Sequence, residues 1–333
     1  MVKLSILELG RVREGFDTRD ALNRARELGI HAEANGFERI WVAEHHNMKG
    51  VSTAATPVVI GHIAGATSTI RVGAGGVMLP NHTPYVIAEH FGTLATLYPD
   101  RIDLGLGRAP GTDQMTLRAL RVDPMKAERF PQDVLELQRW LGDEEDDQRL
   151  HAVPGVGTKV PLWILGSSLF GAQLASQLGL PYGFASHFAP GALDPALKLY
   201  RERFEPSDAL AKPYALVGVN VIAADTDEAA KKLATSQQMS FANMVRGQRG
   251  LMQPPINDID DYWLPHEKAH AEQMLACSII GGPETVRKGL EAFVERTQAD
   301  ELMIVSDMYE PSARLKSLEI IADVMGAKAK TPA

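Results

Sequence analysis

The sequence predicts an α/β protein, a single (β/α)8 barrel (TIM barrel) with an insertion between its seventh and eighth strands. Eight short aliphatic segments alternate with helical patterns along the chain, and strands separated by helices pair in parallel. The length of 333 residues suits such a barrel, which commonly needs about 250. The alternative is an open, doubly wound sheet with a helical second domain.

The first half of the chain contains four strands, each followed by a helix. Asp17 or Thr18 can cap the first helix, and Asn35-Gly36 ends it, because glycine accepts the left-handed cap conformation. Pro84 opens the third helix at an early position, where its missing N–H costs no hydrogen bond. We therefore expect strands at 3–9, 39–43, 70–79 and 102–106, and further helices at 54–67 and 84–98.

The second half continues the alternation after a helix that starts near Pro131, and Gly179 stops the next helix. We expect strands at 161–165, 182–185, 215–223 and 300–306, and helices at 169–178, 191–204, 285–297 and 313–325. The stretch 225–280 does not alternate and is the predicted insertion. Residues 1–326 then form one domain, and 327–333 form a frayed C-terminal tail.

Composition narrows the possible partners. The chain has 34 Lys and Arg against 42 Asp and Glu, and 34 − 42 gives a net charge of −8. Such a chain is not expected to bind nucleic acid or an anionic membrane. Cys277 is the sole cysteine, which excludes an intramolecular disulfide and a cysteine-rich metal site. With no apolar run long enough to span a bilayer, we expect a cytoplasmic protein with a small-molecule substrate.

Active-site residues of (β/α)8 barrels lie where strands end and the following loops begin. The residues directly after the predicted strands are therefore the candidates for chemistry. They are Glu44-His45-His46, Gly75-Gly76, Gly107-Arg108, Gly166-Ser167-Ser168 and His187.

His45 and His46 follow the second strand. Adjacent residues of an extended backbone point to opposite sides, so only one of them easily faces the barrel mouth. Such a histidine is either catalytic or a structural hydrogen-bonding residue. A metal site would need further ligands at other strand ends, and His82 lies before a helix instead. We expect no metal.

The glycines and serines at the next strand ends indicate a ligand-binding site. Gly75-Gly76 interrupts a strand, which indicates close backbone approach to a ligand or tight barrel packing. Ser167 and Ser168 open a helix, where one serves as the N-cap or both help to form an anion site with Arg108. Arg108 is otherwise a surface ion-pair residue. Pro110 replaces the last glycine of a G-x-G-x-x-G pattern, so a Rossmann site is not expected.

The order of these motifs along the chain resembles the bacterial luciferase-like flavin monooxygenases. The resemblance covers nearly the full length, and each motif falls at a successive strand end. It is carried by Asn35–Phe37, Trp41–His46, Gly73–Pro80, Gly105–Gly111, Pro161–Ser168, Gly179–Pro181 and Gly282–Val286.

The resemblance implies an enzyme that uses reduced FMN and O2, through a C4a-peroxyflavin, to oxygenate a small organic substrate. It implies a separate flavin reductase and a homodimer that pairs through the helices at 54–67 and 84–98. It also implies site residues: His45 as the catalytic histidine, a cis peptide at Gly75-Gly76 against the flavin, and phosphate contacts from Arg108, Arg129, Ser167 and Ser168.

Substrate and cofactor stay open at this point. Gly107 stands where true luciferases carry a side chain, so neither light emission nor an aldehyde substrate is implied. Candidate substrate-pocket residues are Asn81, His187 and Phe188. Two alternatives share the barrel: an F420-dependent hydride-transfer enzyme, and a flavin-binding protein without turnover.

Overall fold

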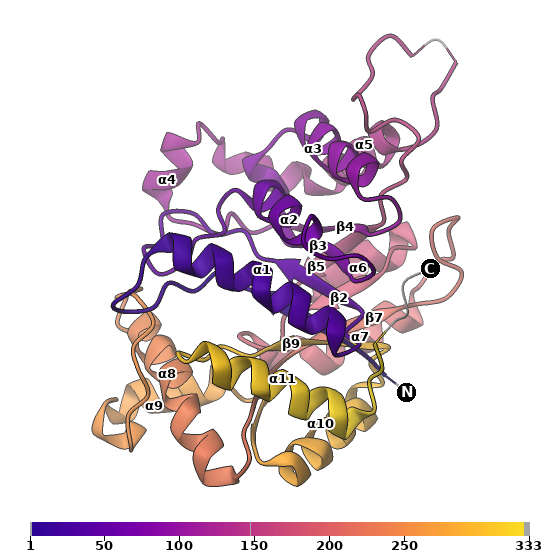
Figure 1. The fold of residues 1–333 in the computed structure, drawn as a ribbon. Coiled ribbons are helices and arrows are strands. Elements are labelled where there is room, and N and C mark those ends of the chain that lie inside the picture. Colours follow the sequence, from indigo (N-terminus) through magenta and orange to yellow (C-terminus); the bar gives the residue numbers. More distant parts are fainter. Residues whose placement is uncertain (1, 147, 330–333) are drawn as a thin grey trace.

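The computed structural model describes residues 2–146 and 148–329. Eight parallel strands close into a barrel, with helices around its outside (Figure 1). Closure is complete because β6 pairs with β7 and β1 pairs with β9. The predicted (β/α)8 barrel is confirmed, and the open doubly wound sheet is wrong. The eight barrel strands are β1 Lys3–Glu8, β2 Arg39–Val42, β3 Arg71–Met78, β4 Ile102–Gly107, β5 Leu162–Gly166, β6 Tyr182–Phe184, β7 Ala215–Ala223 and β9 Glu301–Val305.

The predicted helices begin and end close to the expected residues. The Asp17 side chain caps α1 by accepting a hydrogen bond from the backbone N–H of Asp20 (2.9 Å). Gly179 ends α6 in the left-handed conformation. The helices that follow the strands are α1 Thr18–Ala34, α2 Thr56–Ala64, α3 Pro84–Leu97, α5 Phe130–Leu141, α6 Leu169–Leu178, α7 Leu193–Glu202, α10 Pro283–Thr297 and α11 Pro311–Met325.

Several elements were not predicted. The insertion contains α8 Asp227–Val245, α9 Pro265–Met274 and a ninth strand, β8 Ser278–Gly281, which pairs with the second half of β7. A further short helix, α4 Gln114–Ala119, follows β4. Four 3-10 helices complete the structure: η1 Leu79–Asn81, η2 Pro124–Arg129, η3 Pro190–Ala192 and η4 Ile259–Asp261.

The barrel interior is filled. The indole rings of Trp41 and Trp163 meet edge to face, 5.0 Å apart between centroids, and pack with Leu7 and Met303. A separate, larger core lies between the strands and the surrounding helices. Because the interior is packed, a ligand has room only at the two open ends of the barrel.

A buried ion network lies below the two tryptophans. The Arg39 guanidinium donates hydrogen bonds to Asp103 (Nη1 to Oδ2, 2.6 Å) and to Glu301 (Nε to Oε1, 2.6 Å). All three side chains are buried. Burial lowers the pKa of Arg39, but the two carboxylates outweigh it and raise that pKa above its ordinary value. The network therefore ties β2, β4 and β9 together across the barrel.

Two further expectations concern the chain as a whole. Within residues 2–146 and 148–329, no helix has the length and apolarity needed to cross a membrane. Residues 330–333 of the predicted tail lie outside the described residues. Of the rest of the tail, Ala327 packs against the large outer core, and the backbone of Lys328 lies against Gly36.

Replacing Arg39 by Met tests the ion network. It leaves Glu301 buried without its cation, while Asp103 keeps its contact with Arg71 (2.6 Å), so we expect a loss of about 3–5 kcal/mol in the free energy of unfolding. Urea denaturation followed by circular dichroism measures this loss. As a matched control, Arg287→Met removes an exposed arginine that pairs with Glu284 and Glu291, and it should leave the urea midpoint nearly unchanged. Equal midpoints for both variants would contradict the prediction.

Candidate functional site

The loops after β2, β3 and β4 are bonded to one another at the C-terminal end of the barrel. The backbone N–H of Met78 donates to Glu44 Oε2 (3.2 Å), and the Asn81 side-chain amide donates to the carbonyl of Pro110 (2.8 Å). The backbone N–H of His46 donates to the carbonyl of Gly111 (3.4 Å). These hydrogen bonds therefore hold the three loops together on this side of the barrel mouth.

His45 lies at this mouth with its imidazole unpaired. Its Nδ1 atom is buried and has no hydrogen-bond partner among the described residues. Burial, together with the positive charges of Arg249 and Arg11, lowers the pKa of His45 to about 4. The ring is therefore neutral at pH 7 and has a nitrogen available to a bound molecule.

Glu44 organises the two histidines on the other side of this segment. Its Oε1 atom accepts hydrogen bonds from the Nε2 atoms of His46 and His82, each 2.8 Å long. Burial raises the pKa of Glu44, but these two hydrogen bonds outweigh it and lower the pKa to about 2. Glu44 is a carboxylate at neutral pH, and it fixes the loop that carries His45.

His82 was set aside in the sequence because it precedes a helix, yet it reaches Glu44. The ligand atoms of Glu44, His46 and His82 all lie within 4.8 Å of one another, a donor set that divalent metals also use. The three groups already satisfy one another by hydrogen bonds. The expectation of no metal stays a prediction.

The floor of the mouth is backbone. The peptide between Gly75 and Gly76 is cis, as the resemblance implied. A Cβ on Gly76 would stand 2.6 Å from both the carbonyl oxygen of Gly105 and the side chain of Leu165. Only glycine fits there, because the neighbouring strands β4 and β5 pack directly against it.

Arg108 and Ser168 lie at one side of this floor. Ser168 is the N-cap of α6, but its hydroxyl makes no capping hydrogen bond. The Arg108 guanidinium lies 4.0 Å from the ring centroid of Phe170, in the first turn of the same helix. A cation, an unengaged hydroxyl and a helix N-terminus are thus neighbours, which is an arrangement that binds anions. Ser167, the preceding residue, is half-buried.

Arg129 is placed differently. It ends η2, its side chain is 70% exposed, and its Nε lies 3.8 Å from Asp133 of the next helix turn. In the described part of the chain, it makes no ion pair or hydrogen bond with Arg108 or with α6. Its predicted phosphate contact stays a prediction.

Two of the candidate substrate residues have unpaired polar atoms. Asn81 Oδ1 and His187 Nδ1 are buried without a hydrogen-bond partner within the described ranges. Burial, and the nearby His45 ring, lower the pKa of His187 to about 4. His45 and His187 are therefore neighbours at the mouth, both neutral at pH 7. The exposed Phe188 packs edge-on to His187, 5.0 Å between centroids.

Asn220 was not predicted as a site residue. It is buried in β7, and its amide donates to the backbone carbonyl of His187 (2.5 Å). Its own oxygen accepts from the Gln237 amide of α8 (3.0 Å). Asn220 thereby positions His187. The signal was present in the sequence, because Asn220 is the one side-chain amide in an otherwise apolar strand.

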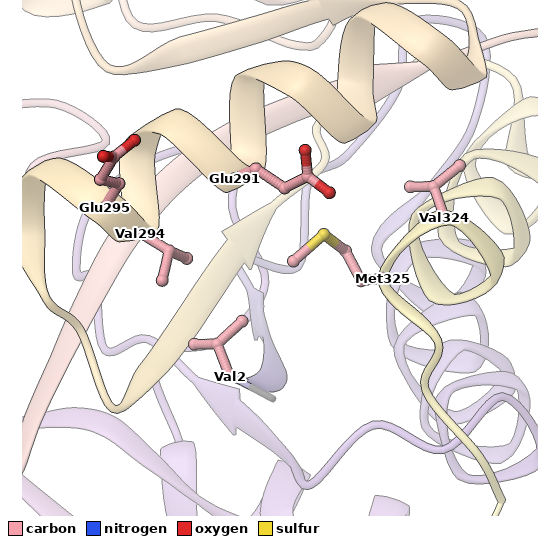
Figure 2. A pocket seen from close by; sticks show the side chains of 6 residues that line it. All are labelled: Val2, Glu291, Val294, Glu295, Val324 and Met325. Atoms are coloured by element: carbon pink, nitrogen blue, oxygen red, sulfur yellow. The ribbon is translucent and has the colours of Figure 1, made fainter.

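The opposite end of the barrel holds an apolar hollow of about 350 Å3 between α10, α11 and the residue before β1 (Figure 2). Its polar groups are two carboxylates on α10, and no imidazole or cation lines it. We assign no chemistry to it. Its lining residues are Val2, Glu291, Val294, Glu295, Val324 and Met325.

Known proteins are similar to this chain in sequence and in fold. The family model described as luciferase-like monooxygenase matches residues 2–301. A protein of Escherichia coli K12 named luciferase-like monooxygenase is 49% identical over 324 residues, which cover 97% of each chain.

Solved structures are also similar to this chain in fold. The apo form of MsnO8 has a TM-score of 0.88 and 32% identity, with full coverage of both chains. The oxygenating constituent of 3,6-diketocamphane monooxygenase from Pseudomonas putida, solved in complex with FMN, has a TM-score of 0.75 and 18% identity. It covers 100% of this chain and 99% of its own. By sequence match over nearly its whole length, this chain belongs to the luciferase-like monooxygenase family.

Proposed function

We propose that the protein is an FMN-dependent monooxygenase that oxygenates a small organic substrate with O2, and that a separate reductase supplies the reduced flavin. The observation that carries the proposal is the position of Arg108 beside the first turn of α6, where the hydroxyl of the N-cap Ser168 makes no capping bond; this arrangement could hold an anion. The FMN complex of the Pseudomonas putida relative supports the same cofactor.

The residues present fit FMN. Arg108, Ser167 and Ser168 would hold its phosphate, with Arg129 as a second cation, and the peptide of Gly75-Gly76 would face the flavin ring. A Cβ at Gly75 would collide with Leu7 and Trp41, and one at Gly76 with Gly105 and Leu165, so glycine is required there by the packing of the barrel. Bound reduced FMN supplies the electrons with which one atom of O2 enters the substrate and the other leaves as water.

The protein's own groups would manage protons and water. His45 is neutral and its Nδ1 is unpaired, so it can hold or deliver a proton at the reacting oxygen. His187, held by Asn220, presents a second neutral imidazole. The Trp41–Trp163 layer blocks the barrel below and keeps water from entering from that side.

Cofactor choice tests the proposal. Reduced FMN and reduced F420 are each added to the purified protein, and O2 consumption is followed. We expect accelerated, O2-dependent oxidation with reduced FMN only. Oxidation of reduced F420 that is coupled to reduction of a carbonyl substrate, and that needs no O2, would identify a hydride-transfer enzyme instead. Binding of FMN without any acceleration would identify a flavin-binding protein without turnover.

The phosphate contacts have a sharper test in the same titration. Arg108→Gln should raise the Kd for FMN roughly tenfold, the usual cost of a lost charge-assisted hydrogen bond, while riboflavin, which lacks the phosphate, should bind equally to both proteins. Ser168→Ala should have a smaller effect of the same kind, as should Arg129→Gln. Arg118→Gln, an exposed arginine of α4, is the control. Equal losses for FMN and riboflavin would refute the phosphate assignment.

Replacing His45 tests its proton role. We expect His45→Asn to lower the product formed per reduced FMN oxidised and to raise H2O2 release to match. In the unmodified protein, this yield should be constant from pH 8 to 6 and fall only as the pH approaches 4, where the ring becomes protonated. The exposed His90→Asn serves as control. A midpoint near pH 6.5 would contradict the low pKa, and an unchanged yield in His45→Asn would contradict the role.

We also propose a homodimer through α2 and α3. Both helices expose large apolar side chains in the single chain, Val58 at 72% and Leu97 at 63%. Light scattering should give twice the 36.3 kDa chain mass. Val58→Asp should shift the mass toward one chain, whereas Leu135→Asp, an exposed leucine on α5, should not. A single-chain mass for the unmodified protein would remove the dimer.

A further inference from the structure

Three segments far apart in the sequence meet beside His45. The backbone N–H of Val12, after β1, donates to the carbonyl of Gly50 (3.0 Å), and that of Met252 donates to the carbonyl of Val12 (2.9 Å). Arg11 forms an antiparallel bridge with Val51. The loop that follows α8 is thereby fixed against the loops that follow β1 and β2.

This junction carries two arginines with hydrogen-bonding capacity to spare. Arg11 donates from Nη2 to Ser240 Oγ (2.8 Å) and forms an ion pair with Asp307 (Nε to Oδ2, 3.6 Å). That distance is too long for a hydrogen bond, so the buried Nε has no hydrogen-bond partner in the part of the chain described. The exposed Arg249 guanidinium lies 3.8 Å from the sulfur of Met48 (Nη1 to Sδ). An unpaired buried guanidinium N–H is costly unless a ligand satisfies it.

Two guanidinium groups lie near His45 although the chain as a whole carries −8. Arg11 and Arg249 both act on His45, and the carboxylate that opposes them there is Glu44. Glu44 is already bonded to His46 and His82. The other nearby carboxylate, Asp307, forms an ion pair with Arg11 (3.6 Å), and burial raises its pKa. Guanidinium groups with free N–H donors on an acidic protein attract anions.

This position is separate from the proposed phosphate site. Arg11 follows β1 and Arg108 follows β4, and in the closed barrel β2 and β3 lie between these strands on one side. On the other side lie β5, β6, β7 and β9. An anion at Arg11 is thus on the far side of the mouth from the end of β4, with His45 beside it.

We propose that Arg11 and Arg249 bind the carboxylate or sulfonate of an anionic organic substrate, and that they hold its apolar remainder next to His45. Guanidinium groups suit this task because their planar N–H donors match the two oxygens of such a group. This proposal rests on the proposed function, which gives the reaction. It adds the chemical class of the substrate.

Calorimetry on the FMN-saturated protein tests the site with three probes of equal chain length. Hexanoate and hexanesulfonate should bind, and the neutral hexanamide should bind at least roughly tenfold more weakly, the worth of one charge-assisted contact. Added salt should weaken the two anions and not the amide. Equal affinities for hexanoate and hexanamide would overturn the site.

Variants separate charge from structure. Arg11→Gln and Arg249→Gln should each raise the Kd for hexanoate roughly fivefold to tenfold, and Arg11→Lys should restore part of the loss. Ser240→Ala removes a bond of Arg11 but no charge, and should keep the affinity for hexanoate. Arg203→Gln, an exposed arginine at the end of α7, controls for net charge. Unchanged hexanoate binding in both glutamine variants would overturn the proposal.

Flavin binding in the same variants distinguishes this proposal from the proposed function. Quenching of flavin fluorescence should give the same Kd for FMN in Arg11→Gln as in the unmodified protein. A loss of FMN affinity equal to the loss for hexanoate would place Arg11 at the flavin and overturn the substrate assignment. If no variant or parent binds FMN while hexanoate is still preferred over hexanamide, the anion site stands and the proposed function fails.

Discussion

The buried contact of Arg39 with Glu301 and Asp103 is the constraint on which the rest of the barrel depends. It joins the second, fourth and last barrel strands through side chains inside the ring, where no water offsets an unpaired charge. Above it the two tryptophans fill the interior. These side chains fill the inside of the barrel. A reaction therefore has room at the C-terminal ends of the strands, where the sequence of the loops can vary without disturbing the barrel.

At the C-terminal end of the barrel, backbone groups and side chains of different chemistry form the candidate site. Glycine backbone provides a flat floor at β3, a helix N-terminus and Arg108 provide a positive rim at β4 and β5, and imidazoles stand at β2 and after β6. The two histidines are each positioned by a neighbouring side chain. Glu44 fixes the loop of His45, and Asn220 fixes His187.

The sequence was sufficient for the barrel because strand and helix periods alternate along it, and because turn glycines and prolines mark the ends. It was insufficient for β8, a four-residue strand that is mostly half-buried and so carries no strong apolar run. His45, Arg108 and Ser168 could be proposed from the sequence because they follow strands directly. Asn220 left a signal as the one side-chain amide of an apolar strand, although its contact with His187 could not be foreseen. The contacts of His82 and Arg11 left no signal, since they join residues 38 and 229 positions apart.

The pairing of β1 with β9 has a consequence for how the chain reaches this structure. Lys3 pairs with Glu301, so the first strand made by the ribosome waits for the last one before its free edge is covered. Contacts of such long sequence separation form slowly, and an uncovered strand edge is prone to join other chains. Until the ring closes, the uncovered strand edges therefore leave newly made protein open to aggregation, and the pairing of β1 with β9 removes that exposure.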